Sequence, residues 1–388
     1  MIPHGKQEIT QQDIDAVLDV LQSDFLTQGP QVPKFEQSIC EAVNAKYATA
    51  VNSATSALHI ACLALGVGKG DVVWTSPISF VASSNCALYC GADIDFVDID
   101  PVSYNMSVEQ LALKLEHHKQ NNLPLPKVVI PVHLCGQSCD MQTISQLSKE
   151  YGFSIIEDAS HAIGGHYQDA PVGNCQYSDI CIFSFHPVKI VTTAEGGVAT
   201  TNNKSLSDKL NLLRSHGVTR SPDLMTEESH GPWYYQQVDL GFNYRMTEMQ
   251  AALGVTQMSR LANFVERRNN LAARYDELLS ELPLTLPKQA DNVISARHLY
   301  IIRLNLSEIN KTHKAVFEAL RQAGIGVNLH YIPIHTQPYY QSLGFENKQL
   351  EQAELFYQSA IGIPLFHTMT DKQQDEVVQA LKDITLCD

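Results

Sequence analysis

The stretch FSFHPVKIVTTAEGG, residues 183–197, decides how the rest of the chain is interpreted. Its apolar start is typical of a strand end, and Ser184 precedes Lys189 by five residues. A Glu-Gly-Gly run closes the stretch at residues 195–197. A protonated lysine is a poor nucleophile, so chemistry on carbonyl groups requires a lysine that is desolvated or covalently bound. Lys189 is therefore a candidate nucleophile, and the alternative is a surface lysine in a loop.

A second stretch, FSIIEDASHAIGG at residues 153–165, places two carboxylates at the end of an apolar run. Buried parallel strands are short apolar runs, and ligands of open α/β sheets bind at the carboxyl ends of the strands. Asp158 is thus expected at a strand end, while Glu157 should point to the opposite face. Pyridoxal phosphate (PLP) needs a carboxylate beside its pyridine nitrogen to keep that nitrogen protonated. Asp158 suits this role, and its alternative is a helix N-cap.

A third stretch, VNSATSALHIACLAL at residues 51–65, opens with small and hydroxyl residues and continues with apolar residues at helical spacing. The free N–H groups of a helix N-terminus bind phosphate without a lysine. Thr55 and Ser56 are the expected donors, although ordinary helix capping also explains these residues. In the next stretch, WTSPISFVASSNCALYCGA at residues 74–92, Phe80 is either a ring that stacks on the pyridine or a core phenylalanine.

These motifs together resemble the DegT/StrS family of PLP-dependent sugar aminotransferases over essentially the full chain, from LTQGP at 26–30 to IPLF at 363–366. Two further runs, HGPWYYQQVDLGFNYRMTEMQAALG (230–254) and GVNLHYIPIHTQPYY (326–340), are similar to the branch that serves pseudaminic acid biosynthesis. The resemblance implies transfer of an amino group from L-glutamate to C4 of UDP-2-acetamido-2,6-dideoxy-beta-L-arabino-hex-4-ulose. The product would be UDP-4-amino-4,6-dideoxy-N-acetyl-beta-L-altrosamine.

The family pattern also implies a role for each matching position, in a homodimer whose active sites are shared. Lys189 would be the catalytic lysine bound to PLP, Asp158 would face the pyridine nitrogen, and Phe80 would cover the ring. The cofactor phosphate would be held by Thr55, Ser56, Ser184 and, across the dimer, Asn243. The nucleotide sugar would meet Leu26, Thr27, Gln28, Gly29, Asn328, Leu329, His330 and Tyr331. Many members have glutamine where this chain has His161, which is either a cofactor ligand near the ring phenolate or a buried histidine.

Composition excludes several other classes of protein. No apolar run approaches the roughly 20 residues of a membrane-spanning helix, and the N-terminus lacks a signal-peptide core, so we expect a cytoplasmic enzyme. The nine scattered cysteines are interpreted as small apolar residues in a reducing compartment. No spacing of Cys and His predicts a metal site. With 27 basic and 42 acidic residues, the net charge of −15 argues against nucleic acid as a partner.

The negative net charge also means that anionic ligands need local positive charge. The candidates for this charge near the cofactor or the diphosphate are Arg214, His216, Arg220 and Arg245. Solvated surface side chains are the equally open alternative for each of them.

Strand-like runs alternate with helical runs in the first half of the chain, at Asp71–Thr75, Ile94–Asp98, Lys127–Val132, Phe153–Glu157, Ile180–Phe185 and Gly197–Thr201. This alternation predicts an α/β domain with a large, mostly parallel sheet over residues 1–246. Apolar spacing over 247–282 predicts one long bridging helix, which leads into a smaller C-terminal α+β domain within 247–388. The polar run at 117–127 is expected to be a surface loop. The whole resembles the aspartate aminotransferase fold, PLP fold type I.

Other functions share parts of this pattern. An aminotransferase that acts at C3, or on a D-configured 4-keto sugar, would have the same cofactor motifs. A PLP-dependent sugar dehydratase of this fold is expected to lack the lysine at position 189. A non-catalytic PLP-binding protein would leave the set of Lys189, Asp158 and Ser184 unexplained.

Overall fold

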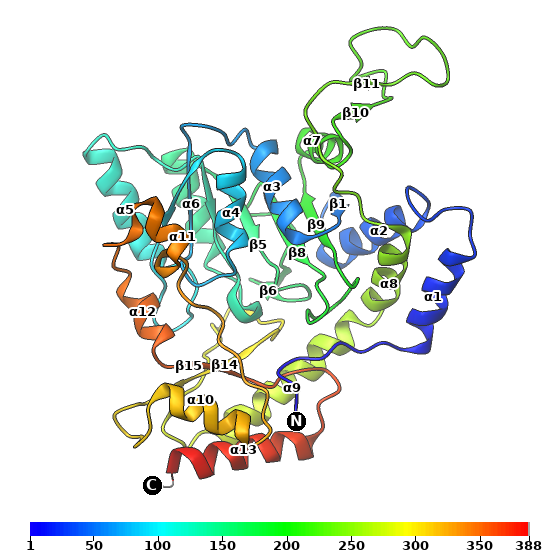
Figure 1. Cartoon of the computed structure of the whole chain (residues 1–388). Helices are drawn as coiled ribbons and strands as arrows, with labels where there is room; N and C mark the ends of the chain where they lie inside the picture. Colours follow the sequence, from blue (N-terminus) through cyan, green and yellow to red (C-terminus); the bar gives the residue numbers. More distant parts are fainter. Residues whose placement is uncertain (387–388) are drawn as a thin grey trace.

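The computed structural model describes residues 1–386, so Cys387 lies outside the described residues. Its largest element is a seven-stranded sheet in the order β1-β9-β8-β5-β4-β2-β3 (Figure 1). The strands are β1 (Tyr47–Val51), β2 (Val72–Thr75), β3 (Asp93–Phe96), β4 (Val128–Ile130), β5 (Ser154–Asp158), β8 (Ile180–Ser184) and β9 (Gly197–Thr201). Only β9 runs against its neighbours, so the predicted mostly parallel sheet is confirmed. The sequence interpretation missed β1.

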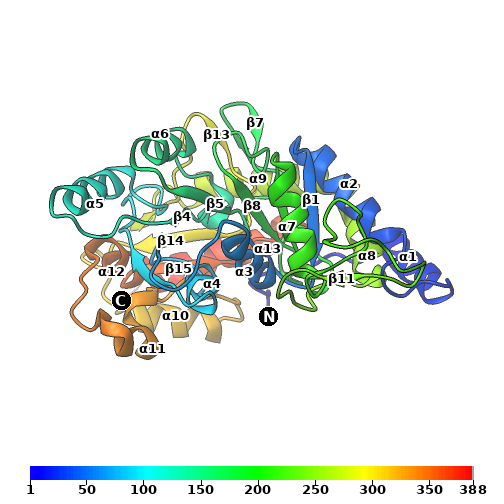
Figure 2. The ribbon, with the colours of Figure 1, turned by 90° about the horizontal axis from the view of Figure 1, so that it is seen from above.

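Helices cover both faces of this sheet (Figure 2). One face is covered by α5 (Val108–Gln120) and α6 (Met141–Tyr151), and the other by α3 (Ala54–Ala64) and α4 (Ala82–Tyr89). Because both faces are covered, strands such as β4 are buried throughout and appear in the sequence as unbroken apolar runs. Since α5 extends to Gln120, the first part of the expected loop at 117–127 is helical instead.

A second core lies below the large sheet and is built around three short antiparallel strands. These are β12 (Leu284–Thr285), β14 (Tyr300–Leu304) and β15 (Ala360–Ile363), packed against α9 (Leu261–Leu278), α10 (His313–Gln322) and α13 (Asp371–Leu386). Ile2 belongs to this core too, since Ile2 N–H donates to the Gly324 carbonyl (2.8 Å). The N-terminus and the C-terminal half therefore pack together, and the domain division at residue 246 stays a prediction.

The single long helix predicted for 247–282 is wrong, because two helices, α8 (Glu248–Met258) and α9, replace it. The break lies at Arg260, whose backbone is non-helical (φ −109°). The Arg260 guanidinium forms ion pairs with Glu8 (3.0 Å) and with buried Asp13 (2.5 Å). These contacts across more than 240 residues leave no trace in the local pattern. The predicted apolar stripe of α9, from Leu261 to Tyr275, is buried as expected.

The remaining helices are α1 (Gln11–Leu21), α2 (Gln31–Val43), α7 (Lys204–Arg214), α11 (Pro338–Tyr340) and α12 (Glu351–Tyr357). The short strands are β6 (His166–Tyr167), β7 (Ala170–Pro171), β10 (Val218–Thr219), β11 (Gln236–Gln237) and β13 (Val293–Ile294). Short non-α turns of helix occur at Leu134–Gly136, Ile334–Thr336 and Gln341–Phe345. Within residues 1–386 no helix combines the length and apolar character needed to cross a membrane, and no cluster of His, Cys, Asp and Glu suits a metal ion.

Candidate active site

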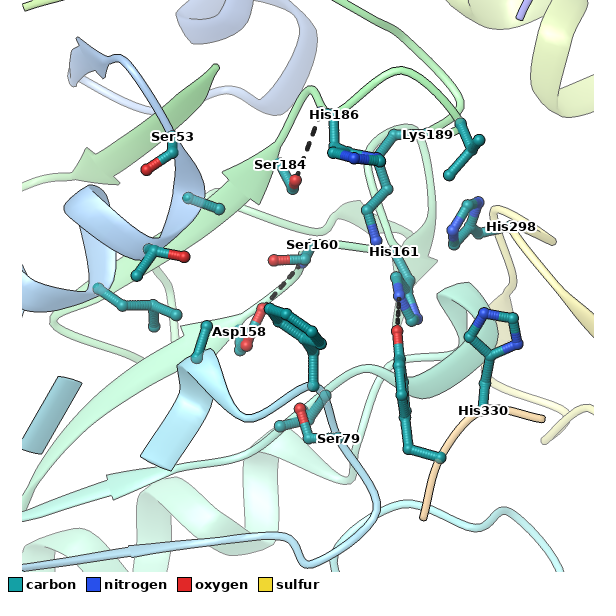
Figure 3. A pocket seen from close by; sticks show the side chains of 18 of the residues that line it. Ser53, Ser79, Asp158, Ser160, His161, Ser184, His186, Lys189, His298 and His330 are labelled. Atoms are coloured by element: carbon teal, nitrogen blue, oxygen red, sulfur yellow. Dashed lines mark hydrogen bonds between the residues drawn. The ribbon is translucent and has the colours of Figure 1, made fainter. Parts of the chain in front are cut away.

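A cavity of about 290 Å³ lies at the carboxyl ends of β5 and β8 (Figure 3). Its wall combines the N-terminus of α3, the segment before α4 and the loop after β8. Gly197 at the start of β9 allows α3 to begin so close to the sheet, since a side chain there would meet the backbone of Ser53 and Ala54 at 2.5 Å. The sheet edge and the helix N-terminus thus converge where the sequence predicted a site.

Lys189 reaches this cavity from the loop after β8, where its N–H donates to the His186 carbonyl (2.9 Å). Burial lowers the pKa of Lys189 to about 8, and the opposing effect of Asp158 is smaller. A larger share of Lys189 is therefore unprotonated near neutral pH than for an exposed lysine. This is the property that a nucleophilic lysine needs.

Asp158 ends β5 and lines the cavity with only 4% of its surface exposed. Its carboxylate accepts hydrogen bonds from the Ser83 hydroxyl (2.6 Å) and the Ser160 N–H (3.1 Å). No helix begins between Asp158 and His166, so Asp158 is not a helix N-cap. Glu157 points to the opposite face, as predicted, and accepts from the His133 Nε2 (2.8 Å).

The predicted helix that begins near residue 54 is confirmed as α3. Only some of the residues predicted to bind the cofactor phosphate line the cavity. Thr55 and Ser184 line it. Ser56 does not, because its hydroxyl donates to Asn52 Oδ1 (2.7 Å). Ser53 caps the helix by accepting from the Ser56 N–H (3.1 Å), and Ser53 also lines the cavity.

Aromatic rings form the wall opposite α3. Tyr331 and His161 stack with an interplanar angle of 19°, and the Tyr331 hydroxyl contacts His161 Nε2 (3.1 Å). Burial raises the pKa of Tyr331 and lowers the pKa of His161 well below its usual value, so tyrosine donates and neutral imidazole accepts. The His161 proton then lies on Nδ1. Phe80 is 60% exposed at the cavity rim, with its ring centre 6.4 Å from that of Tyr331.

Two histidines extend this wall. His330, predicted from the sequence, lines the cavity, and burial lowers its pKa to about 3. His298 was missed, and its ring centre lies 4.5 Å from that of His161. The only sequence signal for His298 was its place just before the strand-like run at 299–304. Sequence reasoning also assigned no role to the other polar lining residues, Ser53, Ser79, Ser160, His186 and Glu195.

Several predicted residues lie outside the cavity of their own chain. Leu26, Thr27, Gln28 and Gly29 connect α1 to α2, and the Leu26 carbonyl accepts from the N–H of Glu248 in α8 (3.1 Å). Asn243 is exposed and pairs with Ser215 through the backbone. Asn328 bonds to the N–H of Leu329 (2.9 Å), and neither lines the cavity.

The expected positive charge is also absent from the described lining. Arg214 donates to the Ala50 carbonyl (2.8 Å) and pairs with Glu36, and it does not line the cavity. His216, Arg220 and Arg245 do not line the cavity either. Among the lining residues, Lys189 is the single lysine or arginine.

Comparison with known proteins identifies the class to which this fold and site belong. Residues 7–382 match the model of the DegT/DnrJ/EryC1/StrS aminotransferase family, and the chain belongs to this family. The chain is 38% identical over 385 residues to the UDP-4-amino-4,6-dideoxy-N-acetyl-beta-L-altrosamine transaminase of Campylobacter jejuni, covering 99% of this chain and 97% of that protein.

Solved structures agree with this assignment. Helicobacter pylori PseC, an aminotransferase involved in the biosynthesis of pseudoaminic acid, superposes with a TM-score of 0.90 at 30% identity and covers 99% of both chains. The PLP form of the putative sugar aminotransferase Spr1654 from Streptococcus pneumoniae has a TM-score of 0.88 at 29% identity, covering 99% of this chain and 98% of that one. The protein is thus a PLP-dependent nucleotide-sugar aminotransferase, and the predicted fold and cofactor are confirmed.

Proposed function

We propose that this enzyme transfers the amino group of L-glutamate to C4 of UDP-2-acetamido-2,6-dideoxy-beta-L-arabino-hex-4-ulose and so forms UDP-4-amino-4,6-dideoxy-N-acetyl-beta-L-altrosamine. The proposed reaction belongs to pseudaminic acid biosynthesis. The observation that supports it most directly is the similarity, over nearly the whole chain, to the Campylobacter jejuni transaminase and to Helicobacter pylori PseC. The convergence of Lys189 and Asp158 in one cavity supports the aminotransferase chemistry itself.

The residues of the cavity suit PLP, and we assign each a role in holding it. Lys189 would bind the cofactor covalently, Asp158 would face the pyridine nitrogen and Phe80 would cover the ring. Thr55, Ser184 and the backbone N–H groups at the start of α3 hold the phosphate, because a helix N-terminus favours anions. His161 lines the cavity, and its buried Nδ1 has no hydrogen-bond partner among the described residues, so it would donate to the cofactor near the ring phenolate. Ser56 acts indirectly, by fixing Asn52 and the first turn of α3.

When it is bound, PLP supplies an electron sink for the carbon that loses its proton. Lys189 performs the proton transfers in both half-reactions, because its lowered pKa allows Nζ to accept a proton and return it near neutral pH. Asp158 holds the proton on the nitrogen that it faces. The rings of Phe80, His161 and Tyr331 line one side of this volume.

We further propose a cytoplasmic homodimer in which each subunit completes the site of its partner. Asn243 and the 26–29 segment lie outside the cavity of their own chain, which leaves them available to a second copy. The shortage of positive charge in the described lining supports the same view, since two anionic ligands meet here.

Product analysis tests the substrate assignment. The purified enzyme is supplied with glutamate and with UDP-linked 4-keto sugars of L-arabino and D-xylo configuration, and the products are identified by NMR. We expect amination at C4 of the L-arabino sugar to be much faster. Preference for the D-xylo sugar would replace this substrate and leave the aminotransferase class intact. Transfer to neither sugar would indicate another nucleotide-linked keto sugar, such as one with its carbonyl at C3, as the substrate.

A further inference from the structure

The hydroxyl of Ser83 links two residues of the cavity wall, Asp158 and Ser79, by hydrogen bonds. Ser83, in the first turn of α4, is buried, and its hydroxyl lies 2.6 Å from Asp158 Oδ2. The same hydroxyl lies 2.6 Å from the hydroxyl of Ser79 and 3.3 Å from the Phe80 carbonyl. Ser79 is buried as well, and it lines the cavity (Figure 3).

The direction of these hydrogen bonds follows from the donors that are present. A serine hydroxyl has one proton, and an ionised carboxylate can only accept. The contact to Asp158 is shorter than the contact to the Phe80 carbonyl and is assisted by charge, so the Ser83 proton points to Asp158. The Ser83 oxygen is then free to accept the proton of Ser79. The order of donation is therefore Ser79 to Ser83 to Asp158.

Donors fixed on both oxygens of a carboxylate hold it in one orientation. With the Ser160 N–H on the other oxygen, Asp158 has one donor fixed on each oxygen, although it is almost fully buried. Ser83 also ties the segment that contains Phe80 to the strand end that holds Asp158, across 75 residues of sequence. The group that covers the ring and the group that faces its nitrogen are thus fixed relative to one another.

We propose that Ser83 is a positioning residue, which through its hydrogen bond keeps the Asp158 carboxylate directed at the pyridine nitrogen of the cofactor. This inference rests on the role of Asp158 given under the proposed function. Ser83 itself does not line the cavity. Its effect on the cofactor is exerted through Asp158.

The test compares cofactor affinity in the full-length protein with Ser83→Ala, Ser83→Thr and Ser83→Cys. The matched control is Ser84→Ala, since Ser84 is the next residue of α4, is equally buried, and bonds to the Tyr340 hydroxyl (2.5 Å) instead. Dissociation constants are measured for PLP and for an analogue with carbon in place of the pyridine nitrogen. Thermal unfolding of each apoprotein shows how much of any loss is structural.

We expect Ser83→Ala to weaken PLP binding about tenfold, because a hydrogen bond to a charged group is lost. Its affinity for the carbon analogue should change less than about twofold, since that analogue offers Asp158 no proton to hold. Ser83→Thr should restore PLP affinity, and Ser83→Cys, which is nearly isosteric with a weaker donor, should fall in between. Ser84→Ala should affect both ligands equally or not at all.

Equal losses for PLP and the carbon analogue would overturn the inference, because they indicate loosened packing. Unchanged PLP affinity in Ser83→Ala would overturn it too. Asp158→Asn separates this failure from failure of the proposed site. If Asp158→Asn weakens PLP binding while Ser83→Ala does not, only the role of Ser83 is wrong. If Asp158→Asn binds PLP as wild type does, the assigned role of Asp158 fails, and the role of Ser83 fails with it.

Discussion

The cofactor cavity and the arm formed by residues 218–241 differ in how far their side chains are buried. In the cavity, Asp158 and Ser184 are buried and held by hydrogen bonds within the chain. The arm, which includes β10 and β11, projects from the body (Figure 1), and it leaves Trp233 72% and Leu240 74% exposed. A single chain thus brings Lys189 and Asp158 together in one cavity but leaves large apolar side chains of the arm exposed. We therefore expect changes in the cavity to affect the chemistry and changes in the arm to affect recognition of the sugar nucleotide.

The largest effect should come from Lys189→Ala in the cavity. Turnover should fall about 1,000-fold or more, because the residue both binds the cofactor and transfers the proton. The wild-type protein should lose its visible absorbance when glutamate is added, and this variant should not. Borohydride reduction of the wild-type enzyme with bound PLP, followed by peptide mass spectrometry, locates the lysine that carries the cofactor. Modification of any other lysine would refute the assignment.

Mixing two inactive variants tests whether the cavity is completed from outside its own chain. Lys189→Ala and Asn243→Ala are each expected to be poor enzymes, but a mixed dimer would contain one site with both changes and one with neither. Random reassembly should restore activity to about a quarter of wild type, since half of the dimers are mixed and each has one intact site. Verified mixed dimers that stay inactive would argue against sharing.

Lys189→Met tests whether the buried charge of Lys189 lowers the stability of the apoprotein. Since burial lowers the pKa of Lys189 to about 8, the unfolded state binds the lysine proton more tightly than the folded state does. The charged lysine therefore destabilises the apoprotein below pH 8, and this cost falls as the pH rises toward 10.5, the ordinary lysine pKa.

At pH 7 the free energy of unfolding of the Lys189→Met apoprotein should exceed that of wild type by about 2 kcal/mol. Because Lys189 is partly exposed, solvent screens its charge and keeps the difference this small. The difference should shrink above pH 8. Denaturant unfolding at pH 7 and pH 10 measures it, and a difference that grows with pH would contradict the expected sign.

Trp233→Ala in the arm should raise KM for the sugar nucleotide about tenfold, if the indole stacks on the uracil ring. The half-reaction with glutamate should be unchanged, because glutamate has no uracil ring for the indole to contact. Leu240→Ala is the control, since Leu240 is an equally exposed residue of the same arm without a ring. If both variants behave alike, the arm contributes only general apolar contact.

The smallest expected effect concerns Tyr331, where the cavity and sugar recognition meet. Tyr331→Phe removes the hydroxyl that donates to His161, and it should narrow the preference for the L-arabino over the D-xylo sugar about fivefold. Cofactor absorbance should stay as in wild type. Initial rates with the two sugars measure the ratio. An unchanged ratio of the two rates would mean that Tyr331 lines the cofactor cavity but does not distinguish the two sugars.

Local sequence alone determined the strand that ends at Asp158, the helix that begins at Ala54 and the placement of Lys189 after β8. These features depend on apolar periodicity and on motifs of a few residues, which short-range backbone geometry translates directly into structure. The same reasoning could place Glu157 and Asp158 on opposite faces, because side chains alternate along a strand. These motifs suggested PLP, and the resemblance to the family then implied a role for each residue that would hold it.

Only the tertiary structure decided the rest, because those features depend on contacts between distant parts of the chain. Arg260 interrupts the predicted long helix where it meets Asp13. Arg214, a candidate for anion binding, is paired with Glu36. Tyr331 meets His161 across 170 residues, and Ser83 meets Asp158 across 75. Charged and polar groups pair with whichever partner the packed fold brings near. Burial makes this pairing necessary, because a buried polar group without a partner destabilises the fold.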